Sequence, residues 1–308
     1  MKRCFDLLVL LTVVLAGTSA RAQDVHYGVN AHEVSASVAD SASDLGAGIV
    51  RVVFGWDVIE PGCKGCFNWS ATDRWRDEAR RTGRLIFGSL AYAPAWANGG
   101  HHYNYPPLDM ADWYDFVYAV ADRYKDDIVL WGVWNEPNLD AYLHGADLQT
   151  YERLVRTARL AIRAANPEAR VLGPEVSHHA IKSGWFAAAM NAFGDQFDIV
   201  TVHWYPDGPP LEKMMDQQVR PLSQRKDVWL TEVGMKPCES HFGEAGQALF
   251  YDRVLRAFEA RRDWWTATIF YDLYDPPQPL DCGAGIVRPD WSNRPAFELY
   301  QRFIRAYP

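Results

Sequence analysis

The segment VLWGVWNEP, residues 129–137, is a run of apolar residues that ends abruptly on Asn135 and Glu136. The proline that follows has no backbone N–H, so it stops the buried strand that the apolar run predicts. A second segment, DVWLTEVG at residues 227–234, has the same form and finishes on the carboxylate of Glu232. Apolar strands that end on polar groups are typical of parallel sheets whose carboxyl ends carry a functional site.

Similar apolar runs recur along the chain and alternate with amphipathic stretches roughly every 35 residues, which predicts parallel strands joined by helices. The predicted strands begin near Tyr27, Ile49, Leu85, Ile128, Arg170, Ile199, Val228 and Ala267. Apolar residues at helical spacing predict helices over residues 72–82, 111–124, 148–165, 243–261 and 294–306. Eight such units predict an α/β fold made of a single (β/α)8 TIM barrel. A doubly wound open sheet is the alternative, but no glycine-rich phosphate loop follows the first strand.

The composition is that of an ordinary globular protein. The chain has 308 residues, of which 48% are hydrophobic and 23% charged. Its 39 acidic and 31 basic residues give a formal charge of −8, and no basic cluster is present. Nucleic acid is therefore excluded as a partner, because a phosphate backbone requires clustered positive charge. The 13 tryptophans favour a sugar ligand, since flat aromatic rings stack on sugar rings.

The first 22 residues are interpreted as a signal peptide, with Lys2 and Arg3 before an apolar run and cleavage after Ala22. The apolar run is shorter than the about 20 residues that span a bilayer. The mature domain, residues 23–308, is therefore expected to be exported to the periplasm or secreted, with no stable membrane insertion once the signal is removed. A retained N-terminal anchor is the alternative.

The number of cysteines is consistent with export to an oxidising compartment. Cys4 leaves with the signal peptide, and an even number remains: Cys63, Cys66, Cys238 and Cys282. Three pairings are open, and Cys63–Cys66 with Cys238–Cys282 is favoured because the first two share one short loop. A zinc site built from the four cysteines is the alternative.

The ordered set of motifs resembles the retaining glycoside hydrolases of clan A, most of all family 39 and next family 5. The motifs that carry the resemblance are WNEP at 134–137, HWY at 203–205, TE at 231–232, VRV at 50–52, APAW at 93–96 and LGPE at 172–175. The resemblance covers roughly residues 27–300 and implies a hydrolase barrel that acts on sugars.

The resemblance implies roles for individual residues at the strand ends. Glu136 is expected to be the acid/base and Glu232 the nucleophile of a double displacement. Asn135 is expected to hydrogen-bond the sugar 2-hydroxyl. Tyr205 and Arg51 are expected to keep Glu232 ionised, by a hydrogen bond and by opposite charge respectively.

Further substrate-binding residues are expected at the strand ends. His203 is expected near the acid/base and the substrate, and Trp96 is expected to stack on sugar. Glu175 either binds a sugar hydroxyl or pairs with an arginine. The clan usually ends strand eight with a tryptophan that forms the floor of the sugar site, so Phe270 or Tyr271 is expected to serve there.

No metal and no organic cofactor are expected. The histidine doublets at residues 101–102 and 178–179 are interpreted as loop residues, and His32 is a lone histidine where a metallohydrolase barrel would need two.

The sequence therefore predicts an exported, retaining glycoside hydrolase that acts without a partner subunit on a β-linked oligosaccharide or polysaccharide. The absence of a recognisable accessory domain favours endo action. A transglycosylase that uses the same two carboxylates and a non-catalytic sugar-binding barrel are the alternatives.

Overall fold

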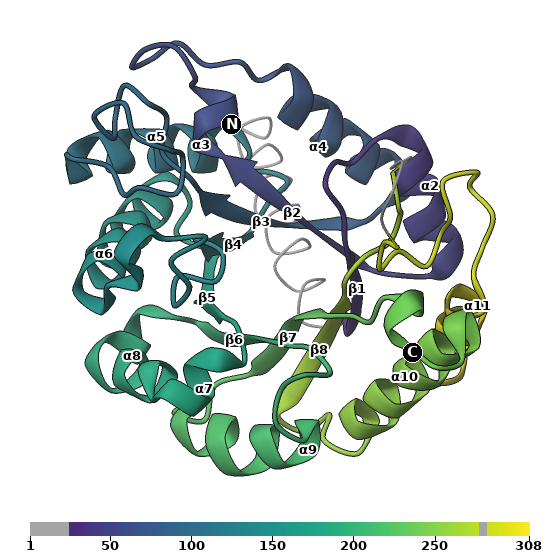
Figure 1. The fold of residues 1–308 in the computed structure, drawn as a ribbon. Helices are drawn as coiled ribbons and strands as arrows, with labels where there is room; N and C mark the ends of the chain where they lie inside the picture. Colours follow the sequence, from purple (N-terminus) through teal and green to yellow (C-terminus); the bar gives the residue numbers. More distant parts are fainter. Residues whose placement is uncertain (1–24, 277–281) are drawn as a thin grey trace, which may run out of the picture.

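The computed structural model describes residues 25–276 and 282–308. Its eight strands form one closed barrel in sequence order, and β1 pairs in parallel with β8. Figure 1 shows the strands around the centre with the helices outside them. The strands are β1 (Tyr27–Asn30), β2 (Ile49–Gly55), β3 (Leu85–Ala91), β4 (Leu130–Val133), β5 (Arg170–Val176), β6 (Ile199–Trp204), β7 (Val228–Val233) and β8 (Trp265–Phe270).

The predicted (β/α)8 barrel is confirmed, and the open doubly wound sheet is excluded because the sheet closes. The helices are α2 (Ala36–Leu45), α3 (Trp56–Ile59), α4 (Ser70–Thr82), α5 (Met110–Arg123), α6 (Leu148–Ala165), α7 (His179–Ser183), α8 (Trp185–Phe193), α9 (Leu211–Met214), α10 (Gly243–Glu259) and α11 (Pro295–Ala306). Shorter helical turns lie at His144–Ala146, Gly194–Gln196, Met215–Val219, Arg220–Leu222 and Pro237–Glu239.

Local signals in the sequence explain where the outer helices begin and end. Asp109 accepts a 2.8 Å hydrogen bond from the N–H of Ala111 at the start of α5. Asp147 accepts one of 2.7 Å from the N–H of Thr150 at the start of α6. Such side chains satisfy N–H groups that have no partner inside the helix. Helix α4 ends at Gly83, which takes a left-handed φ of 68° that glycine adopts without a steric penalty.

The core has two layers, one inside the barrel and one between the barrel and the helices. The inner layer is a compact cluster that includes Ile49, Phe87, Leu130, Leu172, Trp229 and Ile269. Because side chains alternate across a strand, the residues two positions further along also face inward. Toward the carboxyl end of β2 and β7 these residues are Arg51 and Thr231, and both are buried. The inner layer therefore changes from apolar to polar at the mouth of the barrel.

Two disulfides fasten loops near that mouth. Cys63 and Cys66 are bonded within one loop, and Cys238 is bonded to Cys282, with Cα separations of 5.3 Å and 6.0 Å. The favoured cysteine pairing is confirmed. The alternative zinc site is excluded, because a cysteine in a disulfide offers no thiolate to a metal.

The predicted signal peptide, residues 1–22, lies outside the described residues. Across residues 25–276 and 282–308, none of the helices combines the length and the apolar character needed to cross a bilayer.

Candidate active site

The two carboxylates predicted to act together meet at the carboxyl end of the barrel. Glu136 follows β4 and Glu232 belongs to β7. One oxygen of each carboxylate lies within 4.8 Å of the other and of a ring nitrogen of His203. The His203 Nδ1 is 3.0 Å from Oε1 of Glu136 and 3.6 Å from Oε2 of Glu232. The structure therefore brings together the three residues that the sequence motifs placed on strands four, six and seven.

The backbone that carries these groups is held in strained conformations. Glu136 and Glu175 have φ values of 43° and 53°, in a region that side chains other than glycine rarely adopt. The N–H of Glu136 donates a 2.9 Å hydrogen bond to the carbonyl of Glu175. The N–H of Glu175 donates one of 2.9 Å to Oγ1 of Thr201. Such strain persists only where surrounding contacts fix the chain, so both carboxylates are firmly placed.

Arg51 connects four strand ends through one buried guanidinium group. Its Nε and Nη2 donate to Oε2 of Glu175 at 2.9 Å and 2.7 Å. Its Nη1 donates to Oδ1 of Asn30 at 2.8 Å and to Oε2 of Glu232 at 3.2 Å. The Nη2 group also donates to Oδ1 of Asn135 at 2.9 Å. The planar fork of arginine suits this arrangement, because its donors point in fixed directions.

Glu175 is the buried counter-ion of Arg51. Its side chain has no exposed surface, and its second oxygen accepts a 2.8 Å hydrogen bond from the Thr231 hydroxyl. Burial alone would raise the pKa of Glu175, but the charge of Arg51, with that of His203, outweighs it and lowers this pKa to about 2. Of the two expectations for this residue, the structure supports pairing with an arginine.

His203 is completely buried between carboxylates. Burial alone would lower its pKa, but the charge of Glu232 and the interactions with Glu136 and Glu175 outweigh it and raise the pKa to about 9. At neutral pH His203 is therefore an imidazolium whose Nδ1–H donates to Glu136.

Glu232 is held from two sides. The hydroxyl of Tyr205 donates to its Oε1 and Arg51 donates to its Oε2. Burial and the neighbouring Glu232 charge raise the pKa of Tyr205 well above its ordinary value, so the phenol keeps the proton that it donates. Asn135 accepts from Arg51 through its oxygen, which leaves its amide N–H groups to meet a ligand.

The aromatic residues predicted to touch sugar separate into two groups. Phe270 does not serve as a floor for the sugar: it is fully buried and stacks on Tyr251 with ring centroids 3.9 Å apart. Of the two residues expected there, only Tyr271 is therefore retained, and the cause is strand alternation, since Ile269 faces the barrel interior and Phe270 faces outward. Tyr271 is the half-buried residue beside the network, and its ring meets that of Tyr205 edge to face at 6.4 Å.

Trp96 is placed against α3 and makes packing contacts there. Its indole N–H donates a 2.8 Å hydrogen bond to the carbonyl of Glu60. Its ring meets Trp56 edge to face at 5.6 Å. Among the described contacts, none joins it to Glu136 or Glu232. The sequence could not separate this use from sugar stacking, because both need a large aromatic residue after strand three.

Two further residues of the site have no role assigned from the sequence. Asn30 at the end of β1 orients Arg51, and its Nδ2 donates to the Thr231 carbonyl at 3.1 Å. Its position at a strand end was the signal that could have identified it. Tyr142 lies near the charges of Glu136 and Glu232, which with burial raise its pKa. It comes from an irregular loop, where no periodicity marks a residue for function.

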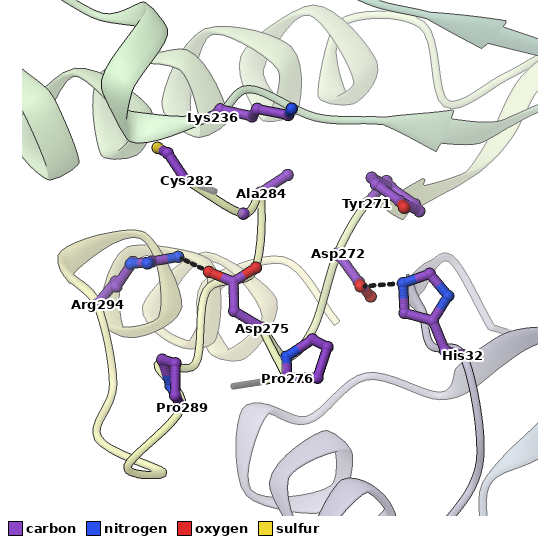
Figure 2. Close-up of a pocket in the computed structure, with 11 residues that line it drawn as sticks. His32, Lys236, Tyr271, Asp272, Asp275, Pro276, Cys282, Ala284, Pro289 and Arg294 are labelled. Atoms are coloured by element: carbon purple, nitrogen blue, oxygen red, sulfur yellow. Dashed lines mark hydrogen bonds and ion pairs between the residues drawn. The ribbon is translucent and has the colours of Figure 1, made fainter. Parts of the chain in front are cut away.

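A pocket of about 300 Å³ opens beside Tyr271, between the segment after β8 and the loop after β1. Figure 2 shows His32 facing Asp272, with Nε2 and Oδ2 3.0 Å apart, and Arg294 facing Asp275. A second cavity of about 380 Å³ shares His32 and reaches Tyr92 and Tyr103. The two cavities therefore adjoin at His32 and are lined by aromatic rings and polar groups.

Two groups of described residues have the geometry to hold a metal ion: Glu136 with His203 and Glu232, and His178 with His179 and Asp207. The first group is poorly suited, because a protonated imidazole has no lone pair for a metal.

Replacing Arg51 tests whether its guanidinium holds the mouth together. We expect Arg51→Met to lower the free energy of unfolding by about 3–5 kcal/mol, because the buried Glu175 carboxylate loses its counter-ion. Urea unfolding measures the change. Arg156→Met is the control, since Arg156 pairs with Glu152 on the exposed face of α6 and should contribute less than about 1 kcal/mol. Equal effects of the two substitutions would contradict this account.

The charge of His203 predicts an alkaline transition. A pKa raised from 6.5 to about 9 contributes stability that is complete below pH 6.5 and is lost as the pH rises through 9. NMR titration of the imidazole signals should give one midpoint near 9, absent in His203→Gln. Glu232→Gln should lower that midpoint, because the charge of Glu232 contributes most to raising the pKa of His203. The surface substitution Glu152→Gln should leave the midpoint unchanged. A His203 midpoint near 6.5 would be inconsistent with the buried cluster.

Comparison with known proteins agrees with the geometry. The family model of the glycosyl hydrolase catalytic core matches residues 100–271, which include both carboxylates. A β-xylosidase from Geobacillus stearothermophilus is 26% identical over 181 residues, which cover 53% of this chain and 36% of that protein. The chain thus matches about a third of that relative's length.

Solved structures share the barrel. A family 39 glycoside hydrolase from Bacteroides cellulosilyticus superposes with a TM-score of 0.71 at 19% identity, over 92% of this chain and 64% of that one. A psychrophilic family 10 endo-β-1,4-xylanase gives a TM-score of 0.70 at 18% identity, over 92% of this chain and 98% of that one. The predicted resemblance to glycoside hydrolases is confirmed, and the family 39 structure shares the barrel fold. Since the family model covers more than half of its residues, this chain belongs to the glycosyl hydrolase catalytic core family.

Proposed function

We propose that this barrel is a retaining glycosidase in which Glu136 is the acid/base and Glu232 the nucleophile. The observation that carries the proposal is the spacing of the two carboxylates, whose nearest oxygens lie within 4.8 Å. Retaining enzymes hold the pair about 5–5.5 Å apart, whereas inverting enzymes need about 6.5–9.5 Å to admit a water molecule. The short separation supports direct attack by one carboxylate on the sugar.

In the first step, Glu232 attacks the anomeric carbon while Glu136 protonates the departing glycosidic oxygen. The C–O bond to the leaving group breaks and a glycosyl ester of Glu232 forms. Arg51 and Tyr205 support this role, because their donors stabilise an ionised Glu232 and fix its orientation. Asn135 can donate its amide N–H to the sugar 2-hydroxyl, a contact that strengthens as charge develops.

The hydrogen bonding of Glu136 supports its contact with the glycosidic oxygen. His203 donates to Oε1 of Glu136, which leaves Oε2 for the glycosidic oxygen.

In the second step, Glu136 acts as the base. Once Glu232 is esterified its negative charge is gone, so the deprotonated Glu136 is left beside the imidazolium of His203. It then removes a proton from the water that hydrolyses the ester, and the sugar leaves with its original configuration.

The proposed substrate is a β-linked polysaccharide cleaved internally. The β-linkage is suggested by the β-xylosidase relative and the endo-β-1,4-xylanase neighbour. Endo action is suggested by the same neighbour, because this chain covers 98% of the endo-β-1,4-xylanase but 36% of the β-xylosidase.

Export and a monomeric state complete the proposal. The two disulfides favour an oxidising compartment, in agreement with a signal peptide over residues 1–22. A monomer suffices because every member of the network comes from one chain. Transglycosylation remains an alternative outcome of the second step, in which a sugar hydroxyl replaces water.

Leaving-group dependence tests the role of Glu136. With phenyl β-xyloside, Glu136→Ala should lower kcat/KM by about 10²–10⁴-fold, the usual contribution of a general acid. With dinitrophenyl β-xyloside the loss should be much smaller, because that phenolate departs without a proton. Glu152→Ala on the surface should change neither value. An equal loss with both substrates would contradict the assignment.

Product size tests endo action. Wild-type protein and Glu232→Gln are incubated with soluble β-linked plant, fungal and bacterial polysaccharides, and the products are resolved by mass. We expect a ladder of oligosaccharides from the wild type and none from the variant. Release of a single sugar or disaccharide from the start would indicate exo action, and binding without cleavage would favour the sugar-binding alternative.

A further inference from the structure

We propose that His178, His179 and Asp207 form a Zn²⁺ site at the rim of the barrel mouth, separate from the catalytic carboxylates. His178 and His179 lie where β5 leads into α7, and Asp207 lies in the loop between β6 and α9. One ligand atom of each side chain lies within 4.8 Å of those of the other two. Two loops from neighbouring barrel units thus converge on one point.

The strongest support comes from His178. Its side chain is only 6% exposed, yet neither of its ring nitrogens has a hydrogen-bond partner among the described residues. Buried polar atoms in proteins are nearly always paired, and an unpaired one is destabilising. The Nε2 of this ring lies 3.6 Å from Oδ2 of Asp207. A cation between these two atoms would satisfy the buried nitrogen.

The ring of His178 is held in place while its neighbours can adjust. A Cβ on Gly208 would lie 2.9 Å from Cγ of His178, so the backbone of the loop after β6 closes directly on the ring. The rings of His178 and His179 have centroids 4.2 Å apart. His179 and Asp207 are exposed, so they can change rotamer. Two ligands of a tetrahedral Zn²⁺ ion lie about 3.3–3.4 Å apart, so these atoms would close by up to about 1.5 Å, which a change of rotamer in the two exposed side chains allows.

The donor set selects the ion. Two imidazole nitrogens and one carboxylate oxygen suit Zn²⁺, with water as the fourth ligand. Ca²⁺ and Mg²⁺ prefer oxygen ligands alone, so they are disfavoured here. The cavity that contains the three residues measures about 540 Å³ and leaves space for the water. Lys182 also lines it, but its exposed side chain can turn toward solvent.

The bound ion would stiffen both loops that flank the acid/base. Ser177, next to His178, exchanges hydrogen bonds of 2.8 Å and 3.0 Å with Asn138, which follows Glu136 by two residues. Asp207 follows Tyr205, the hydrogen-bond partner of Glu232, by two residues. The ion therefore has a structural role, and the chemistry of the two carboxylates does not depend on it.

The test uses protein without a histidine tag, stripped with a chelator and dialysed. Addition of ZnCl2 at about 100 times its Kd should raise the Tm by about 3–5 °C. MgCl2 and CaCl2 should not change the Tm. The zinc content after gel filtration should be one ion per chain. Absence of a Zn²⁺-dependent shift in the wild type would overturn the proposal.

Variants locate the ion without reference to activity. His179→Ala and Asp207→Asn change exposed side chains, so both variants should fold, and both should lose the Zn²⁺-dependent shift. His101→Ala, which alters the other histidine doublet, should keep it. Glu232→Gln should also keep it, which separates this site from the catalytic carboxylates. A shift that survives in His179→Ala and Asp207→Asn, or that disappears in Glu232→Gln, would refute the site.

Discussion

The buried guanidinium of Arg51 is the interaction on which the mouth of this barrel depends. It reaches polar groups on the ends of β1, β5 and β7 and on the segment after β4, so a single side chain sets the relative positions of residues far apart in sequence. A buried cation is unfavourable unless opposite charges surround it. The carboxylates of Glu175 and Glu232 provide those charges, and in return they are fixed at short range.

The same charge arrangement explains how three acidic side chains share a small volume. His203 remains protonated, because its pKa is raised to about 9, and it faces all three carboxylates. Glu175 is ionised at neutral pH, with a pKa lowered to about 2 by the charge of Arg51, and is buried away from solvent. Glu175 is therefore structural, while the side chains of Glu136 and Glu232 keep 9% and 12% of their surface exposed. Exposure to solvent separates the supporting acid from the pair proposed to react.

Much of this arrangement could be predicted from the sequence, because it follows from strand periodicity. Apolar strands buried on both faces identified the barrel, and the abrupt change to Asn135 and Glu136 marked a strand end at the mouth. The same alternation could have separated Tyr271 from Phe270, but this requires the register of β8, which short apolar runs do not define. Tyr142 lies in an irregular loop whose path depends on tertiary contacts. The meeting of His178 with Asp207 depends on two such loops, so pattern alone could not show it.

We propose that the short separation of Glu136 and Glu232 lets one carboxylate attack the sugar directly. The stereochemistry of the first-formed product tests this most directly. Proton NMR should follow the anomeric signals while wild-type protein hydrolyses a soluble β-linked substrate that it cleaves. We expect the β-anomer to appear first and the α-anomer only later, by slow mutarotation. An α-anomer formed first would mean inversion, and would contradict the roles assigned to Glu136 and Glu232.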